Sequence, residues 1–531
     1  MHRIPATTLK AWLHDGGEIS LLDLREHGQY GQGHPLYAVS LPYSRLEAQI
    51  ERLVPNASTR MVLFDDGQMT LAERAFRLLK RYGYENVHIL EGGAAGWRES
   101  SYELFTGVNV LSKAFGELAA EVDNVPQISA ADLRARLDRG DDLVIVDGRP
   151  KHEYRKMNIP GSICCPVGEL VLRIGEIAPD PATTVIVNCA GRTRSIMGAA
   201  TLRRFGVPNP VYALKNGTMG WLLAGFELEH GSSRFYPDTP GESATGTLRE
   251  RAFAFAREHG VTGVSLAQAE EWRGAPDRVT YLLDIRTDSE FAERTWPGAI
   301  SAPGGQLLQA TDEWIGVRHS RLVVADQHRV RSIMIAFWLR QLGWDAYYLD
   351  ADLPQNPRHE RRQTLADRHL PELPFLPASE IARLLPRTTL LDLRSSMRYR
   401  SGHIAQAAWA VRPLLAEALA GKEGRPVMLI GADPVIARAA AMDLMEAGHA
   451  VVGYNDEEAA AWRGAGMDVV ATPDEPADSK CIDYLFFVHD RHDGNLEAAR
   501  QYLAWELDLL ERFDENERRA FRLAALQPAM P

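Results

Sequence analysis

Cysteine is scarce in this sequence, with 4 residues among 531. So few cysteines cannot provide a disulfide framework for a chain of this length, and a reducing cytosol keeps thiols free. The four residues contain no C-x-x-C pair and no Cys/His group at zinc-finger spacing. These absences exclude a disulfide-stapled secreted scaffold and a structural zinc site, so each cysteine has to be judged alone.

Long apolar runs and an excess of basic residues are also missing. No run of about 18 apolar residues could span a bilayer, and the N-terminus lacks the basic segment, apolar core and cleavage site of a secretory signal. The net charge of −12 argues against a nucleic-acid backbone as the main partner. We therefore expect a cytoplasmic protein with no membrane or nucleic-acid partner; its oligomeric state stays open.

A repeated unit of roughly one hundred residues organises the chain. An apolar run ending in Asp-x-Arg occurs four times, at residues 21–25, 145–149, 282–286 and 390–394. A second apolar run follows each one, at residues 61–64, 185–188, 322–325 and 427–430. Short loops then lead into amphipathic helices, such as those predicted at 195–205 and 332–342. Strands that alternate with helices at this spacing predict parallel α/β sheets.

The length agrees with several domains, since a domain takes roughly 100 to 200 residues. We expect an α/β protein of four domains, each a parallel sheet flanked by helices, with linkers near residues 231–241 and 352–377. A tail with helical periodicity follows the last domain. The expected domains, called copies one to four below, cover residues 1–110, 125–232, 255–355 and 374–470, and the tail covers residues 471–531.

Only copy two has a cysteine, Cys189, as the first residue of the loop after its second strand. A loop that leads into a helix N-terminus directs several backbone N–H groups at one point, and the helix dipole adds partial positive charge. Two arginines in the loop, Arg192 and Arg194, add full charges, and Gly191 permits a tight backbone. These features predict that Cys189 is partly thiolate near pH 7 and therefore nucleophilic.

With these features the chain resembles the rhodanese-like sulfurtransferases, as four tandem rhodanese-homology domains. The markers are the Asp-x-Arg strand ends, the bend at residues 159–161, the Cys189 loop and the Gly-Trp pairs at 96–97 and 220–221. The resemblance implies that Cys189 takes sulfane sulfur from thiosulfate, the favoured donor, or from 3-mercaptopyruvate or a glutathione persulfide. The resulting persulfide passes its sulfur to a thiol or to cyanide.

The resemblance also assigns the residues around the nucleophile. The loop backbone cradles the sulfur, Arg192 and Arg194 bind the anionic donor, and no cofactor or metal is required. The substrate-binding residues implied in this way are Ala190, Gly191, Arg192, Thr193, Arg194 and Ser195.

The other copies lack the nucleophile, because Asp65, Asp326 and Gly431 stand at or near the position of Cys189. We expect these copies to be inactive. The simplest role for Asp65 and Asp326 is to accept the N–H groups of their own loops; the alternative is that these domains bind a cationic or thiol-bearing partner.

Two other functions remain open. The first is a scaffold, or a sensor of redox state or persulfide, in which Cys189 reacts without turnover. The second, less favoured, is a phosphatase or arsenate reductase. Tyrosine phosphatases place five residues between the cysteine and the arginine, whereas four residues separate Cys189 from Arg194.

Three residues are expected to support the site. Asp147 and Arg149 recur in copies that lack the cysteine, which indicates an architectural ion pair with hydrogen bonds to loop backbone. Trp221 packs at a domain edge or forms a wall of the pocket.

The remaining cysteines are expected to be structural. Cys164 and Cys165 pack in the core, with a resolving thiol as the alternative for one of them, and Cys481 is structural. The histidine-containing segment at 489–493 is interpreted as a solvated turn and not as a metal site.

Overall fold

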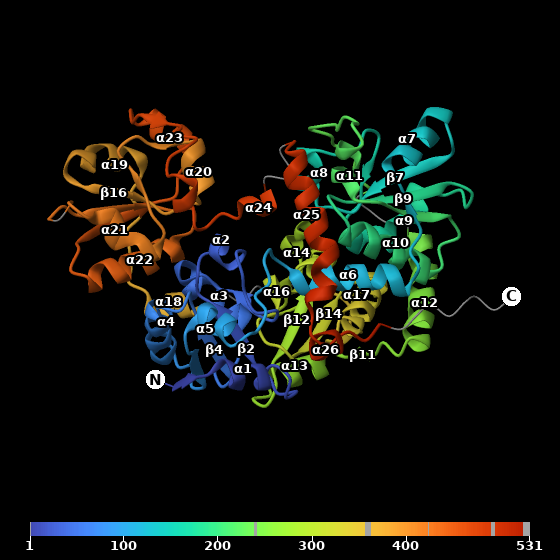
Figure 1. The fold of residues 1–531 in the computed structure, drawn as a ribbon, viewed down its shortest axis with the longest axis horizontal. Coiled ribbons are helices and arrows are strands. Elements are labelled where there is room, and N and C mark those ends of the chain that lie inside the picture. Colours follow the sequence, from blue (N-terminus) through green and yellow to red (C-terminus); the bar gives the residue numbers. More distant parts are fainter. Residues whose placement is uncertain (1, 238–241, 356–362, 423, 490–493, 524–531) are drawn as a thin grey trace. The chain divides into compact units, whose positions relative to one another are not determined.

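A computed structural model of the chain (Figure 1) forms two compact units. The first unit combines residues 1–108 with 361–486, and the second combines residues 109–360 with 487–531. Within the described part of the chain, no helix is both long and apolar enough to cross a membrane. The structure describes residues 2–237, 242–355, 363–422, 424–489 and 494–523.

Copies one, two and three each contain a five-stranded sheet in which neighbouring strands are parallel. The strand order by chain position is 1-5-4-2-3 in every case. Copy one contains β1 (His2–Ile4), β2 (Ser20–Asp23), β3 (Val39–Ser40), β4 (Met61–Phe64) and β5 (Val87–Leu90). Copy two contains β6 (Gln127–Ile128), β7 (Leu143–Asp147), β8 (Ile163–Cys164), β9 (Thr184–Asn188) and β10 (Val211–Leu214). Copy three contains β11 (Gly263–Val264), β12 (Thr280–Asp284), β13 (Ile300–Ser301), β14 (Arg321–Ala325) and β15 (Asp345–Leu349).

Copy four has the same arrangement without the first edge strand. Its parallel sheet has the order β18-β16-β19-β20. Where the other copies have an edge strand, Phe375 makes an isolated parallel bridge to Tyr454. The strands of copy four are β16 (Thr389–Asp392), β18 (Ala408–Trp409), β19 (Val427–Ile430) and β20 (Val451–Asn455), with β17 (His403–Ile404) and β21 (Val469–Val470) forming a separate antiparallel pair.

Helices flank the sheets of all four copies (Figure 1). Copy one contains α1 (Ala6–Trp12), α2 (His27–Tyr30), α3 (Leu46–Leu53), α4 (Thr70–Arg81) and α5 (Gly93–Glu99). Copy two follows α6 (Val110–Val122) and contains α7 (Ala130–Arg139), α8 (Lys151–Lys156), α9 (Leu170–Ile177), α10 (Thr193–Phe205) and α11 (Gly217–Leu223). Copy three follows α12 (Glu242–Glu258) and contains α13 (Leu266–Gly274), α14 (Asp288–Glu293), α15 (Gly304–Gln309), α16 (Thr311–Trp314) and α17 (Val330–Gln341). Copy four contains α19 (Ala378–Leu384), α20 (Ser396–Ser401), α21 (Leu415–Leu419), α22 (Pro434–Glu446) and α23 (Ala459–Gly464), after α18 (Leu365–His369).

The helices expected after the second apolar runs of copies two and three form as α10, which follows β9, and α17, which follows β14. Neither helix is amphipathic. In α10, 12 of 13 residues are buried, and in α17, 10 of 12 are buried. The reason is that each helix is covered on both sides: α10 packs against its sheet and against α6, and α17 packs against its sheet and against α12. A helix enclosed in this way is apolar around most of its circumference.

The Asp-x-Arg strand ends form the same corner in all four copies. In copy two, Arg149 Nη2 lies 2.7 Å from Asp147 Oδ2 and donates to the backbone oxygen of Met157, eight residues further on. Arg25, Arg286 and Arg394 make the corresponding bonds to Asp23, Asp284 and Asp392 and to a carbonyl eight residues later. The expected architectural ion pair is therefore present in every copy, and it fixes the bend after the strand that ends in Asp-x-Arg.

Two copies pair within each unit. In the second unit, the 3-10 turn η2 (Val167–Glu169) of copy two packs on α15 of copy three, where a Cβ on Gly168 would lie 2.8 Å from the Gly305 nitrogen. In the first unit, η1 (Tyr43–Arg45) of copy one contacts η4 (Arg412–Leu414) of copy four. Copy two therefore pairs with copy three, and copy one pairs with copy four.

The tail expected at 471–531 is divided between the units: residues 471–486 belong to the first and residues 487–531 to the second. The helical periodicity expected in the tail is confirmed by α25 (Leu496–Asp508), in which Leu496 and Leu507 are exposed while Tyr502, Trp505 and Glu506 are buried. Residues 238–241 and 356–362 of the linkers, and residues 490–493, lie outside the described residues. The other tail elements are η5 (Asp478–Lys480), α24 (Phe486–His489), η7 (Leu509–Arg512) and α26 (Glu515–Arg518).

Candidate active site

Cys189 lies at the point where β9 ends and the loop to α10 begins. The preceding residue, Asn188, donates from Nδ2 to Asp147 Oδ2 at 2.9 Å, which ties this strand end to the Asp147–Arg149 corner. The Cys189 side chain is 2% exposed, and its Sγ lies 3.6 Å from Ser195 Oγ. Ser195 Oγ in turn donates to the backbone oxygen of Arg192 at 2.8 Å. The thiol is therefore enclosed by its own loop.

The N-terminus of α11 sets the direction of the loop backbone. Backbone N–H groups of Thr218 and Met219 donate to the carbonyl oxygens of Cys189 and Ala190, at 2.8 and 3.1 Å. This close approach requires glycine at position 217, because Gly217 has φ +55° and a Cβ there would lie 2.2 Å from the Cys189 oxygen. The loop carbonyls are held against α11, so they are satisfied away from the thiol.

The loop N–H groups are unused in copy two and occupied in copies one and three. Among the described residues, no acceptor takes the backbone N–H groups of residues 190–195. In copy one, Asp65 accepts from the N–H groups of Gly67, Met69, Leu71 and Ala72 at 3.0 to 3.2 Å. In copy three, Asp326 Oδ2 accepts from the Arg331 nitrogen at 3.0 Å. The expectation that these aspartates cap their own loops is confirmed.

Both arginines of the loop are held by carboxylates, which differs from the two available cations expected from the sequence. Arg192 donates from Nε and Nη2 to the two oxygens of Glu117 at 2.7 and 2.6 Å. Arg194 donates from Nη1 and Nη2 to the two oxygens of Glu153, both at 2.8 Å. The physical reason is burial: a guanidinium removed from water needs a partner, and a carboxylate provides two parallel hydrogen bonds.

The two carboxylates differ in their environments. Burial raises the pKa of Glu117, in spite of the hydrogen bonds from Arg192. Burial alone would also raise the pKa of Glu153, but the Arg194 guanidinium outweighs it and lowers this pKa to about 2, from 4.5. The Arg194–Glu153 pair is therefore ionised across the physiological range.

Glu153→Gln should destabilise the second unit by about 2–3 kcal/mol at pH 7, since it leaves Arg194 buried beside a neutral amide. Because the folded-state pKa of Glu153 is lowered, its contribution is complete above the ordinary pKa and is lost as the pH falls from about 4.5 towards 2. Urea unfolding of wild type and variant at pH 7, 5 and 3 measures this difference. Glu121→Gln, an exposed change on α6, is the control, and a difference that stays unchanged at pH 3 would contradict the lowered pKa.

Helix α25 of the C-terminal segment covers the loop at Gly191 and Thr193. It packs against α11 and α6 (Figure 1). Its Glu506 is 1% exposed, and Glu506 Oε1 accepts from Thr193 Oγ1 at 2.9 Å and from Lys113 Nζ at 3.4 Å. A Cβ on Gly191 would lie 3.2 Å from Glu506 Oε2. The tail thus contributes a buried carboxylate to the Cys189 loop.

Copy three borders the loop at Arg194. Arg194 Nη1 also donates to Gln306 Oε1 of α15 at 3.1 Å. Gln306 also lines a cavity of about 820 Å³ between copies two and three, whose other lining residues include Arg155 and Asp288, of opposite charge. Gln306 thus connects Arg194 to the edge of this cavity, while α25 covers the Gly191 side of the loop.

Trp221 lies in the core and forms no part of the site. It is 1% exposed and packs with Ile128, Leu133 and Ile186. In copy three, which lacks this tryptophan, Trp296 fills the corresponding apolar cluster beside Leu282.

The other cysteines have the properties of structural residues. Burial raises the pKa of Cys164 to about 12, and burial raises that of Cys165 well above its ordinary value. Cys164 Sγ donates to the Arg149 oxygen at 3.4 Å. Burial also raises the pKa of Cys481, which is 2% exposed. A raised thiol pKa disfavours the reactive thiolate.

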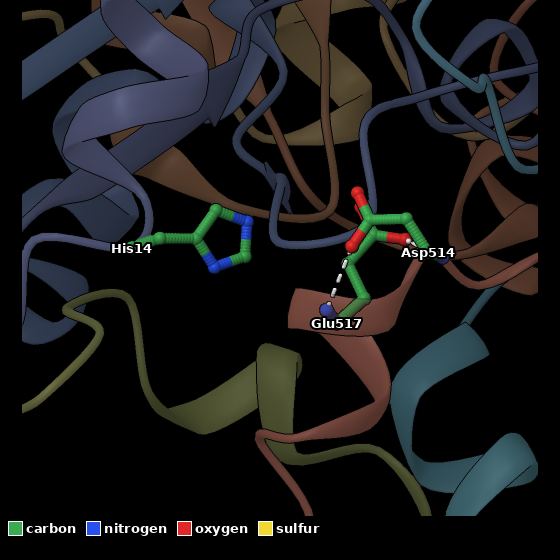
Figure 2. A group of neighbouring side chains, drawn as sticks. All are labelled: His14, Asp514 and Glu517. Atoms are coloured by element: carbon green, nitrogen blue, oxygen red, sulfur yellow. Dashed lines mark hydrogen bonds between the residues drawn. The ribbon is translucent and has the colours of Figure 1, made fainter.

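Figure 2 draws His14, Asp514 and Glu517. The dashed line marks the capping box at the start of α26, in which the Asp514 side chain accepts from the Glu517 backbone N–H at 2.9 Å. His14 belongs to the first unit, whereas the two carboxylates belong to the second. The group carries no inference of a metal site.

Glu117, Glu153, Gln306 and Glu506 were not identified from the sequence. For Glu153 a signal existed: copy three repeats the glutamate as Glu290 and the arginine as Arg331, and these two residues also pair, at 2.9 Å. Copies one and four lack both. For the other residues no repeat-internal signal exists, because they come from α6, the neighbouring copy and the tail.

Comparison with known proteins decides the family. A profile of the Rhodanese-like domain matches three segments of the chain, residues 5–100, 129–224 and 265–355. The chain belongs to the rhodanese-like family. These segments contain the strands of copies one, two and three except the first edge strands β1, β6 and β11, and the Cys189 loop lies in the second rhodanese-like segment.

Similar proteins agree with this assignment. A crystal structure of a thiosulfate sulfurtransferase from Pseudomonas aeruginosa is 38% identical, covers 99% of this chain and 100% of its own, and has a TM-score of 0.90. The 3-mercaptopyruvate sulfurtransferase of Escherichia coli K12 is 28% identical over 181 residues, which are 29% of this chain and 62% of that protein. SseB of Mycobacterium tuberculosis H37Rv, named a putative thiosulfate sulfurtransferase, is 24% identical over 35% of this chain and 78% of its own length. The chain thus spans about three fifths of the Escherichia coli relative.

Proposed function

We propose that this protein is a rhodanese-type sulfurtransferase in which Cys189 of copy two is the nucleophile. Copies one, three and four, within the ranges expected from the sequence, are rhodanese-like domains without activity, because Asp65, Asp326 and Gly431 cannot form a persulfide. The partners are a small anionic sulfur donor and a thiol acceptor. Names of similar proteins, which include thiosulfate and 3-mercaptopyruvate sulfurtransferases, support the reaction class.

The observation that carries the proposal is the set of loop N–H groups around Cys189 that no acceptor among the described residues takes. In copy one the same position holds a carboxylate that receives four backbone hydrogen bonds. The loop geometry therefore stabilises one negative charge at the end of a short side chain. On Cys189 that charge belongs to the thiolate and, after transfer, to the outer sulfur of a persulfide.

The reaction proceeds in two steps. The Cys189 thiolate attacks the outer sulfur of thiosulfate, an S–S bond forms to Cys189, the S–S bond of the donor breaks, and sulfite leaves with the electron pair. An acceptor thiolate or cyanide then attacks the outer sulfur, and Cys189 departs as a thiolate. Loop N–H groups and the N-terminus of α10 stabilise the anion at each stage. Ser195 Oγ lies 3.6 Å from the Cys189 sulfur, where it can contact the reacting atom.

Mass spectrometry of the intact protein tests the first step. After incubation with thiosulfate, 3-mercaptopyruvate or glutathione persulfide, we expect a gain of about 32 Da, one sulfur atom, on the peptide that contains Cys189. The same treatment should leave Cys164, Cys165 and Cys481 unmodified, since burial raises their thiol pKa values. No added sulfur on Cys189 with any donor would overturn the proposal.

One observation favours a second function, a persulfide sensor without turnover: Cys189 is 2% exposed beneath a loop that α25 covers. A turnover assay with cyanide or dithiothreitol as acceptor separates the two functions. Repeated turnover supports the transferase, whereas loading of Cys189 without turnover supports the sensor.

A further inference from the structure

The charges around the Cys189 loop are balanced in pairs. Four cations lie in or beside the loop, and each one contacts a carboxylate. The pairs are Arg192 with Glu117, Arg194 with Glu153, Lys113 with Glu506 and Arg149 with Asp147. These four pairs leave no net positive charge for a donor, so among the described residues it is the loop N–H groups and the N-terminus of α10 that attract an anion.

The corresponding loop of copy one shows how much charge such N–H groups take up. There a single carboxylate, Asp65, accepts hydrogen bonds from four backbone N–H groups and is 2% exposed. The position accommodates one negative charge. Around Cys189 that charge is already supplied by the thiolate or the persulfide, so each further negative charge on the donor must be stabilised by something else.

Glu506 adds a negative charge on the side of the loop where α25 packs. Its Oε1 is bound by Thr193 and Lys113, whereas its Oε2, beside Gly191, accepts no hydrogen bond from any residue that the structure describes. The side chain is 1% exposed, so water screens its charge poorly. A buried carboxylate oxygen without a donor repels an anion that approaches Cys189.

We infer that Glu506 selects the charge class of the sulfur donor, favouring donors with one negative charge over dianions such as thiosulfate. This inference rests on the proposed sulfurtransferase function and adds a specificity-determining residue from the C-terminal tail to it. A monoanionic donor is 3-mercaptopyruvate. The Cys189 thiolate attacks its sulfur, the S–S bond forms, the C–S bond breaks, and the electron pair stays on carbon, which takes the thiol proton to give pyruvate.

The test compares kcat/KM for thiosulfate with kcat/KM for 3-mercaptopyruvate in the full chain. The repulsion between Glu506 and the donor grows with the charge of the donor. Removing the Glu506 charge therefore relieves about twice as much repulsion for a dianion as for a monoanion. Glu506→Gln should therefore raise the ratio of thiosulfate to 3-mercaptopyruvate about 3- to 10-fold. Glu497→Gln, an exposed change on the same helix at a carboxylate that pairs with Arg500, is the matched control and should leave the ratio unchanged.

Lys113→Met should have the opposite effect, and it tests the inference if Glu506→Gln fails to fold. This change removes the cation that balances Glu506, so the ratio of kcat/KM for thiosulfate to kcat/KM for 3-mercaptopyruvate should fall about 3-fold or more. A ratio that moves less than twofold in a folded Glu506→Gln or Lys113→Met protein, or that moves equally in Glu497→Gln, overturns the role of Glu506. If Cys189 of the wild type takes sulfur from neither donor, the proposed function falls together with this inference. If Cys189 takes up sulfur but the ratio of the two kcat/KM values does not change in the variants, the inference about Glu506 is wrong while the proposed function stands.

Discussion

Cys189→Ser is expected to lower kcat/KM for sulfur transfer by at least about 10³-fold while the fold stays intact. The change replaces one sulfur by one oxygen in a side chain that already lies next to a hydroxyl, Ser195 Oγ. A serine hydroxyl is almost fully protonated near neutral pH and cannot hold a transferable sulfur. The loop N–H groups and the neighbouring ion pairs remain, so donor binding should be weakened far less than transfer.

Two measurements make this result specific. Steady-state assays with thiosulfate and with 3-mercaptopyruvate report activity, and circular dichroism with thermal unfolding reports the fold. Cys481→Ser is the control, because this cysteine also is buried but belongs to the first unit, whereas the Cys189 loop belongs to the second. Retention of more than a tenth of wild-type activity in Cys189→Ser would show that another residue carries the sulfur.

Arg331→Met is expected to destabilise the second unit by about 3–5 kcal/mol. Arg331 is fully buried and donates to Asp326, Glu169 and Glu290 at 2.8 to 2.9 Å. Glu169 belongs to copy two and the other two carboxylates to copy three, so this one guanidinium joins the paired copies. Methionine keeps the approximate volume but leaves three carboxylates without their cation.

The pH dependence of this variant follows from the carboxylates. In the wild type, burial would raise the pKa of Asp326 and Glu290, but Arg331 outweighs it and holds both below their ordinary values. Without Arg331, burial is the largest remaining influence and should raise these pKa values above those of the unfolded chain. The folded variant then binds protons more tightly than the unfolded one, so its deficit relative to wild type should shrink as the pH falls from 7 to 5.

Hydrogen–deuterium exchange of α17 and urea unfolding measure the effect of Arg331→Met. Arg340→Met, a partly exposed change on the same helix, is the control and should cost less than about 1 kcal/mol. The prediction is wrong if both variants lose the same stability.

The predicted secondary structure agrees closely with the observed elements because it depends on local patterns. Apolar runs at 61–64, 185–188, 322–325 and 427–430 coincide with β4, β9, β14 and β19 to within one residue. Parallel strands buried on both faces require continuous apolar runs, so these segments are recognisable without any knowledge of their neighbours. The predicted amphipathicity of α10 and α17 is wrong because α6 and α12, which cover them, do not belong to the repeated pattern.

The candidate site was predictable where the repeat exposed a difference between copies. Cys189 is the one cysteine at the first loop position, and Asp65 and Asp326 mark the same position in copies one and three. Glu117 and Glu506 were not predictable, because α6, which carries Glu117, precedes the repeat of copy two, and Glu506 follows Cys189 by more than three hundred residues. Charges that meet only after folding leave no periodic signal.

The sequence by itself determined the repeated α/β units, the strand and loop positions, and the single cysteine at the loop of copy two. Each of these depends on residues close together along the chain, where hydrophobic periodicity and spacing act directly. Only the tertiary structure decided that copy one pairs with copy four and copy two with copy three, that Arg192 and Arg194 are neutralised, and that α25 places Glu506 beside Gly191 and Thr193 of the loop. These contacts join distant segments, and burial, which demands a partner for every charge, selects them.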